Sequence, residues 1–404
     1  MRGERGVVLW MAAAAIVMIL GMAAVTIDLA SLYVARDEAQ RAADAAALAG
    51  AEEFVTSGYT AGGVNAATVT TLVTNAAIAA GSANSVGGQA VQIQTSDVSV
   101  NVSSPNNPQV TVTVQNTTAR GNALPTLFAR IFGISSANVG ATATAEAYNP
   151  SGNGSPPVAT ECVKPWLIPD CDPTRVHHGN SGSDCTPGNQ GHHFDHLFDI
   201  TTGAINFPGP ASQGGVIGET LQFGPESYAG QQQGNVYYPA NVSGGLGQTY
   251  AQTITSCTPL PFACGGTVPV LTNITVPTTN TAIQSLIHAS GQGMSVGQDS
   301  IPSTASGPPF AIFAGPANPY IASGSQIANS DSIVSVPIFD FSQQQQSGNN
   351  YSEVTLGFMQ LFITQTDSSG DINGIVLNIS GCGTNNESGE PVEGTTPVPV
   401  RLVQ

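Results

Sequence analysis

The chain is poor in charge and has a single lysine. Only 9% of its 404 residues are charged, and Lys164 is the sole lysine. A chain without a basic surface cannot neutralise the phosphates of a nucleic acid, so the composition argues against nucleic-acid binding. A phosphate-binding GxxxxGK loop is also absent from the sequence. The net charge is −17, and past residue 54 nineteen carboxylates and five basic residues leave −14, which keeps an exterior domain soluble.

No charged residue occurs between Val7 and Ile27, and no proline occurs in the first 54 residues. At about 1.5 Å per residue, a helix over this stretch crosses the roughly 30 Å hydrocarbon core of a bilayer. Arg2 and Arg5 precede it and Asp28 follows, so the excess of positive charge predicts a cytoplasmic N-terminus. The sequence therefore predicts a single-pass membrane protein, in contact with lipid, with its bulk periplasmic or extracellular.

A cleaved secretory signal is the alternative interpretation of this stretch. Its basic beginning fits such a signal, but its apolar part is longer than the typical ~7–15 residues. A retained anchor therefore fits better.

Past the apolar span, the pattern predicts that the same helix continues. Asp37 with Arg41, and Arg41 with Asp44, have the spacing of intrahelical ion pairs. Small side chains from Ala39 to Ala51 let another backbone approach closely, so this stripe is expected to pack on a second helix or a partner. Alternatively, the alanines serve only helix propensity. We expect four positions to set the depth and pairing of the helix: Asp28, Arg36, Arg41 and Asp44.

The chain then alternates between helical and strand periodicity. The patterns predict a helix over residues 64–80, two antiparallel strands over 91–102 and 109–116, a short amphipathic helix over 124–134 and a strand over 138–149. The sequence NPSGNGSPP that follows is typical of a linker. We therefore expect a membrane anchor and extended helix over 1–54, a small α+β unit over 55–149, a linker over 150–159, and a β-rich, disulfide-bonded domain over 160–404.

The C-terminal part is rich in turn residues. The chain has 46 Gly and 27 Pro, and its later apolar runs have strand length and are separated by turn clusters, the pattern of a sandwich or a barrel. One helix is expected, over residues 281–290. The predicted fold class is α+β, with an N-terminal transmembrane and amphipathic helix and a mainly β C-terminal domain.

All six cysteines follow the predicted anchor, on its exterior side. An even number in an oxidising compartment predicts disulfides, and six cysteines allow fifteen pairings. The preferred single pair is Cys257 with Cys264, because the TPLPFA between them can form a hairpin tip. Cys382 is left to bridge back from the C-terminal end.

The segments ERGVV, AVTIDLASLYVAR and RAADAAALAGAEE resemble the N-terminal module of the TadG-like, or Tad, proteins associated with Flp-type pilus assembly. The resemblance covers Arg5 to Glu53, about an eighth of the chain, and LFARIFG before the ATATA strand is also similar. It implies an inner-membrane protein with an external domain, laid out like a pseudopilin, whose partners are pilus-assembly or pilin proteins. The chain departs from cleaved prepilins, because Val8 and Met11 stand where a glutamate is expected, fifth after Gly3 and Gly6.

The densest group of ligand-type residues is GHHFDHLFD. If they converge, His192, His193, His196 and Asp199 could hold zinc or copper, because neutral imidazole is a ligand for both. No HExxH or paired CxxC motif fixes such a geometry, and a solvated polar loop explains the same residues.

Two further motifs have simpler explanations. Asp367 to Gly374 places oxygen ligands at alternate positions, as calcium loops do, but Ile372 stands at the sixth position where an EF-hand needs glycine. A hairpin turn explains the same residues. Gly293 to Gly297 matches the G-x-S-x-G of hydrolases without the required strand-to-helix context, so chance explains it better.

The sequence therefore predicts a non-enzymatic, membrane-anchored component of Flp pilus assembly that acts through protein contacts in the cell envelope. No cofactor and no small-molecule substrate is evident. The alternatives are a metal-dependent envelope enzyme that uses the His192 to Asp199 cluster, and a surface adhesin stabilised by calcium.

Overall fold

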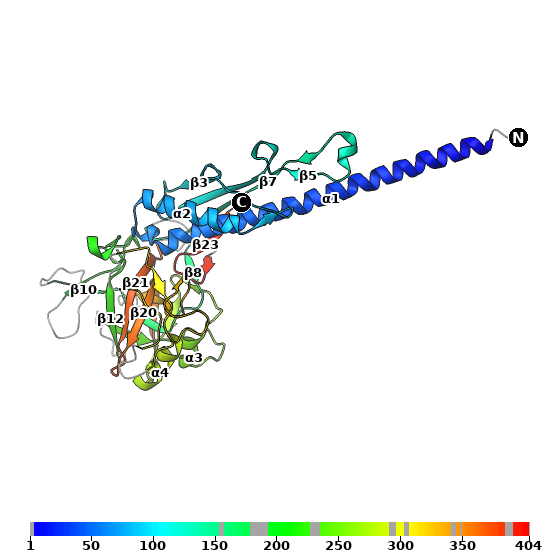
Figure 1. The fold of residues 1–404 in the computed structure, drawn as a ribbon. Coiled ribbons are helices and arrows are strands. Elements are labelled where there is room, and N and C mark those ends of the chain that lie inside the picture. Colours follow the sequence, from blue (N-terminus) through cyan, green and yellow to red (C-terminus); the bar gives the residue numbers. More distant parts are fainter. Residues whose placement is uncertain are drawn as a thin grey trace.

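The computed structural model describes residues 4–152, 157–177, 193–226, 235–290, 296–302, 307–340, 345–347, 350–383 and 391–403. One long helix, α1 (Glu4–Thr56), projects as a rod from a folded body (Figure 1). From Val8 to Leu20 every residue of α1 is exposed, and Trp10 is 80% exposed. The predicted α+β class with a long N-terminal helix and a mainly β C-terminal region is confirmed.

The second half of α1 forms one unit with a second helix and a four-stranded antiparallel sheet of order β23-β7-β4-β3. The sheet lies against α1 through alternate residues of β4, of which Val110, Val112 and Val114 are buried. Asn65 caps the second helix by accepting a hydrogen bond from Thr68 N at 2.9 Å. The bounds of these elements are α2 (Ala66–Ser82), β3 (Val98–Asn101), β4 (Gln109–Asn116), β7 (Val139–Ala147) and β23 (Val400–Val403). The predicted second helix, the hairpin and the later strand are thus present. The first strand of the hairpin begins at Val98 and not at Val91, because residues 95–97 form a 3-10 turn.

The chain's last strand returns to this first unit. Antiparallel pairing of β23 with β7 joins Val400 to Ala147 and Val403 to Thr144. The predicted boundaries had placed residues 400–403 with the C-terminal domain. Similarly, β8 (Val158–Thr160) begins within the expected linker and is buried in a small sheet with β14 (Phe262–Ala263) and β22 (Val392–Gly394).

The predicted short amphipathic helix over residues 124–134 is wrong. Only one 3-10 turn forms, η4 (Ala129–Phe132), between the paired strands β5 (Leu124–Pro125) and β6 (Ser136–Ala137). Gly133, at φ 82°, takes the left-handed conformation that ends a helix. Leu124 is buried in the core of the first unit, but the large apolar side chains from Leu127 to Ile134 are exposed.

The C-terminal body is built on a closed ring of six strands. The ring runs β20-β18-β9-β13-β12-β21 and closes because β21 also pairs with β20. Alternate residues of all six strands converge in one buried cluster, as the inside of a barrel requires, and α3 and α4 add Ile254 and Ile283 to it. Of the two predicted alternatives, a sandwich and a barrel, the structure thus forms the barrel. The strands are β9 (Trp166–Pro169), β12 (Thr220–Pro225), β13 (Val236–Pro239), β18 (Ile333–Phe339), β20 (Asn350–Thr366) and β21 (Ile372–Gly381).

The remaining elements surround this framework. The helix predicted over 281–290 is α4 (Val276–Leu286), which begins earlier than expected, and a second short helix is α3 (Tyr250–Thr255). The short strands are β1 (Ser85–Val86), β2 (Gln89–Ala90), β10 (Asp172–His177), β11 (His193–Asp195), β15 (Thr267–Pro269), β16 (Ile312–Phe313), β17 (Gln326–Ile327) and β19 (Gln345–Ser347), and the other 3-10 turns are η1 (Tyr59–Ala61), η2 (Thr95–Asp97), η3 (Thr118–Arg120) and η5 (Ala211–Gln213).

The predicted disulfide between Cys257 and Cys264 is wrong. Cys257 pairs with Cys162, and Cys264 pairs with Cys382. The residues before Cys264 form no hairpin tip, because β14 pairs with β8 and carries Cys264 to the end of β21. The expectation that Cys382 bridges back from the C-terminal end is confirmed. Cys171 is disulfide-bonded as well.

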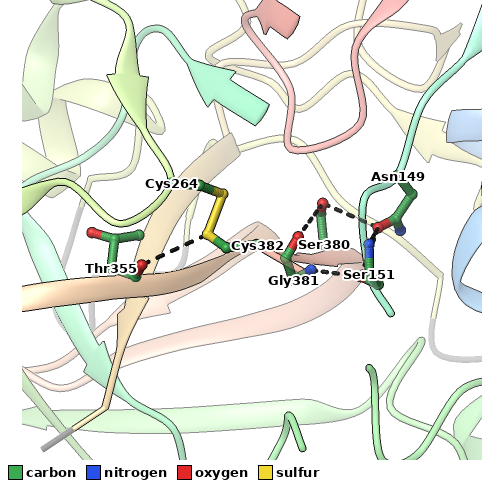
Figure 2. Close-up of a disulfide and its surroundings, with 7 residues drawn as sticks. All are labelled: Asn149, Ser151, Cys264, Thr355, Ser380, Gly381 and Cys382. Carbon is green, nitrogen blue, oxygen red and sulfur yellow. Dashed lines mark hydrogen bonds between the residues drawn. A yellow bond between two sulfur atoms is a disulfide. The ribbon is translucent and has the colours of Figure 1, made fainter. Parts of the chain in front are cut away.

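A buried polar network beside the disulfide between Cys264 and Cys382 joins the first unit to the barrel (Figure 2). The Asn149 Oδ1 atom accepts from Ser151 Oγ at 2.6 Å and from Ser380 Oγ at 3.1 Å, and Ser151 Oγ in turn accepts from Gly381 N at 2.6 Å. On the α1 side, Asn378 Nδ2 of β21 donates to Val55 O at 3.0 Å. Because these groups are buried and lie on both units, they fix the barrel to the end of α1.

Candidate functional site: the anchor helix and its surroundings

The buried half of α1 packs through a stripe of alanines. Ala39, Ala43 and Ala47 are fully buried, in one cluster with residues of α2 and the sheet. A methyl group added at Gly50 would lie 3.3 Å from Val110 and 3.4 Å from Ala77, which measures how closely the backbones approach. The expectation that the stripe packs on a second helix is confirmed. Since the stripe is covered, it is not a surface for a partner.

Asp28, the first charged residue after the apolar span, accepts hydrogen bonds from three backbone amides of a distant segment. Its side chain is only 5% exposed, and its carboxylate accepts hydrogen bonds from Leu127 N at 2.8 Å, Phe128 N at 2.9 Å and Ala129 N at 2.6 Å. These amides begin the η4 turn, so the carboxylate caps it. Burial raises the pKa of Asp28, but the three amide donors, with Arg130 nearby, outweigh it and lower the pKa below its ordinary value.

Residues 124–137, the segment that Asp28 binds, form a loop held by internal hydrogen bonds. Thr126 Oγ1 donates to Ile134 O at 2.5 Å, and Ile134 N donates to Ala129 O at 3.1 Å. Five large apolar side chains of this segment have 36 to 79% of their surface exposed: Leu127, Phe128, Ile131, Phe132 and Ile134. In Figure 1, β5 and the segment after it lie at the end of the folded body that faces the protruding half of α1.

The other predicted packing positions lie on the polar side of α1. Arg41 forms the predicted ion pair with Asp37, and both side chains are largely exposed. Asp44 instead accepts a hydrogen bond from Gln40 Nε2 at 2.8 Å. Arg36 is exposed and lines a shallow groove of about 280 Å³ beside Tyr33. Of the four expected positions, only Asp28 is buried, and the role of all four in depth and pairing stays a prediction.

A cavity of about 650 Å³ lies where the end of α1 meets the barrel. Glu52 and Glu53 line one part, and Lys164 lines another. Lys164 Nζ donates to Ile254 O at 2.6 Å and to Ser256 O at 3.1 Å, and burial lowers the pKa of Lys164 to about 8. The amine is therefore held by neutral carbonyls, a structural arrangement at the junction.

The residues of the predicted metal cluster have separate partners where the structure describes them. His196 Nδ1 lies 2.9 Å from Asp170 Oδ2, and Asp199 Oδ1 accepts from Thr201 N at 2.8 Å and Thr202 N at 3.0 Å. His193 belongs to β11, while His192 lies outside the described residues. Across the described parts of the chain no three ligand-type side chains come together. The metal site stays a prediction, which elemental analysis of the natively oxidised protein would test.

The Asp367 motif forms the turn between β20 and β21. Asp367 Oδ1 accepts from Ser369 N at 2.8 Å and from Asp371 N at 3.1 Å, and Thr366 pairs with Ile372. The hairpin interpretation is confirmed. Most of the G-x-S-x-G motif lies outside the described residues.

The anchor helix also carries the match to a known family. Residues 6–53 match the Tad family model, described as "Putative Flp pilus-assembly TadE/G-like". The chain matches no curated protein and no solved structure. The fold and the match together define a protein with a Tad-like helix that continues into an α+β body. The resemblance to the TadG-like proteins is confirmed in the segment where the sequence indicated it, and it supports involvement in Flp pilus assembly.

Proposed function

We propose that this chain is a non-enzymatic, membrane-anchored component of Flp pilus assembly that acts through protein contacts in the cell envelope. The observation that carries the proposal is the position of the family match, because residues 6–53 coincide with α1. One continuous helix thus holds both the apolar span and the core of the first unit.

The exposed half of α1 supports the membrane anchor. This helix is long and apolar enough to cross a membrane, and its apolar window is wholly unburied. A row of exposed large side chains such as Trp10, Met18 and Leu20 is favoured where lipid covers it. We place the N-terminus in the cytoplasm and the body in the periplasm or outside the cell, from the charges that flank the span.

The rigid joint supports a scaffolding role. No proline interrupts α1, and a buried hydrogen bond from Asn378 of the barrel to Val55 O holds its end. A second one, from Asn149 of the first unit to Ile379 O, joins that unit to the barrel. A force or a displacement that acts on the barrel is therefore transmitted to the membrane span without a flexible linker. Such a body suits a protein that anchors or positions neighbours during assembly.

Crosslinking in the native membrane tests this proposal. After mild crosslinking, the oxidised full-length chain is expected to co-purify with pilus secretin or pilin components. The matched control is a chain whose residues 7–27 are replaced by a cleavable secretory signal, which exports the same body without an anchor. Loss of pilus assembly in cells that carry this control is expected, and unimpaired assembly would contradict the proposal.

A further inference from the structure

We propose that residues 127–134 insert into the interfacial layer of the membrane beside the anchor helix, so that the protein contacts the bilayer at two places. This inference rests on the proposed membrane anchor. The ligand is a lipid surface, and Asp28 is the positioning residue that holds the inserted turn against α1.

The position of the turn is fixed at the end of the apolar span. Asp28 follows Ile27 directly, and its carboxylate binds three consecutive amides of the turn at 2.6 to 2.9 Å. If Ile27 marks the exterior edge of the hydrocarbon core, the turn lies at the level of the head groups. Figure 1 shows no other part of the body reaching as far along α1.

The surface of the turn suits lipid more than water. Ile131 is 79% exposed and Phe132 68% exposed, and three further large apolar side chains flank them. A soluble surface rarely gathers so many such side chains on one turn, and patches of this kind mark protein or membrane contacts. Aliphatic and aromatic side chains on a protruding turn are those that partition into the interface.

Backbone amides of the turn have hydrogen-bond partners within the protein, as a medium of low polarity requires. Asp28 satisfies the amides of Leu127 to Ala129, while Ile131 N donates to Phe128 O and Gly133 N to Arg130 O, both at 3.0 Å. Unsatisfied amides would make entry into lipid costly, and here the capping carboxylate removes that cost.

The neighbouring side chains on α1 make the patch continuous with the span. Leu29, Tyr33 and Val34 are exposed by half or more, and Tyr33 lies six residues past Ile27, about 9 Å along the helix axis. Tyrosine is enriched at this depth, and the exposed Arg130 and Arg36 are suited to lipid phosphates although the exterior part carries −14 overall. This continuity favours lipid over a protein as the occupant.

Depth-dependent fluorescence quenching tests the inference on the full-length oxidised chain in vesicles of phosphatidylethanolamine and phosphatidylglycerol. The probe is F132W in a W10F background, and the matched control is L246W in the same background, because Leu246 is an exposed residue of the C-terminal body. Trp166, the second native tryptophan, is buried in the barrel and stays in every chain, so the fluorescence of W10F alone is subtracted from each spectrum. The difference between the unmutated chain and W10F gives the signal of Trp10, which reports on the anchor itself.

The indole at position 132 is expected to lose fluorescence when the lipids carry bromine near the head group, and to lose less when bromine lies near the chain ends. The indole at position 246 is expected to be unaffected. Adding D28N to the probe chain is expected to reduce the quenching at 132, with an unchanged circular dichroism spectrum as the check on folding.

Quenching of Trp10 without quenching at position 132 would overturn the inference while leaving the anchor intact. If Trp10 itself escapes quenching, the proposed anchor fails instead. Protection of position 132 from water-soluble reagents in cells, with no quenching in vesicles, would assign the turn to a protein partner and also overturn the inference.

Discussion

The two halves of α1 are both helical and each presents an apolar surface, yet they are built for different surroundings. From Val8 to Ile27 the helix carries Leu, Ile, Met and Val side chains that nothing in the protein covers. From Ala35 to Ala51 the buried positions are almost all alanine. Large side chains suit contact with fluid lipid, whereas small ones let α2 and the sheet approach the helix backbone.

The difference shows that apolar character alone does not say what a helix packs against. Gly81 of α2 approaches Ala46 so closely that an added methyl group would lie 3.2 Å from the Ala46 side chain. No such constraint exists at Gly21, where an added methyl would meet nothing within 4 Å. Residue size thus separates the buried apolar face of the second half from the exposed apolar surface of the first half.

Truncating a large side chain should therefore matter only in the buried half. Phe54 is fully buried, so Phe54→Ala is expected to lower the free energy of unfolding by about 3–5 kcal/mol, because it leaves a cavity. Met18→Ala, in the exposed half, is the control and should leave unfolding of the body unchanged. Urea titrations followed by near-ultraviolet circular dichroism measure both variants, and equal losses would erase the distinction between the halves.

A charge should be tolerated least in the exposed half. Ile19→Arg is expected to disfavour membrane insertion by about 2.5–3.5 kcal/mol, because the guanidinium would lie in hydrocarbon. The measurement is the fraction of chain recovered with membranes after alkaline extraction. Arg41→Gln, on the solvated face past the span, is the control and should not change that fraction.

Enlarging an alanine should also destabilise the protein only in the buried half. Ala46 faces Gly81 in the core, so Ala46→Leu is expected to cost about 1–3 kcal/mol of unfolding free energy by overpacking. Ala23→Leu, at an exposed position, should be neutral. Should Ala46→Leu prove as stable as the unmutated chain, the close approach of α1 and α2 would be refuted.

Asp28 marks the boundary between the halves, and its titration should release the turn that it holds. The pKa of Asp28 is lowered in the folded protein, so this stabilisation is full above the ordinary aspartate pKa and is lost as the pH falls through the lowered value. Hydrogen exchange of the Leu127, Phe128 and Ala129 amides should accelerate in Asp28→Asn at neutral pH. Slow exchange in that variant would show that the carboxylate is dispensable.

Lys164, which lines the cavity between the end of α1 and the barrel, gives an effect that depends on pH. Burial lowers its pKa to about 8, so between about pH 8 and the ordinary lysine pKa the folded chain binds fewer protons than the unfolded chain. The free energy of unfolding is therefore expected to rise with pH across that window. Because the chain has one lysine, a ¹³C-lysine-labelled sample gives one ε-carbon signal, and its titration midpoint measures the pKa directly.

The sequence predicted those elements whose signals are local. The continuous helix through Asp28, the second helix, the hairpin of β3 and β4, and the Asp367 turn all follow from periodicity and turn residues over short windows. The ion pair of Asp37 and Arg41 follows from spacing alone.

What the sequence did not predict depends on contacts between distant residues. The pairing of Cys264 with Cys382 follows from β14 joining β8, and the role of Asp28 follows from amides about a hundred residues away. Every residue except proline has a backbone amide, so the sequence could single out the Asp28 carboxylate but could not show which amides it binds. The exposed LFARIFG turn lacked helical structure because no core lies beneath it.

The return of β23 to β7 has a consequence for biogenesis. During synthesis, β7 leaves the ribosome more than two hundred residues before Val400, so its outer edge has no strand beside it while the barrel is being made. An unpaired edge is a template for aggregation, so the unfinished chain is expected to be most prone to aggregate over that interval. Synthesis of the last residues is thus the event that completes this sheet.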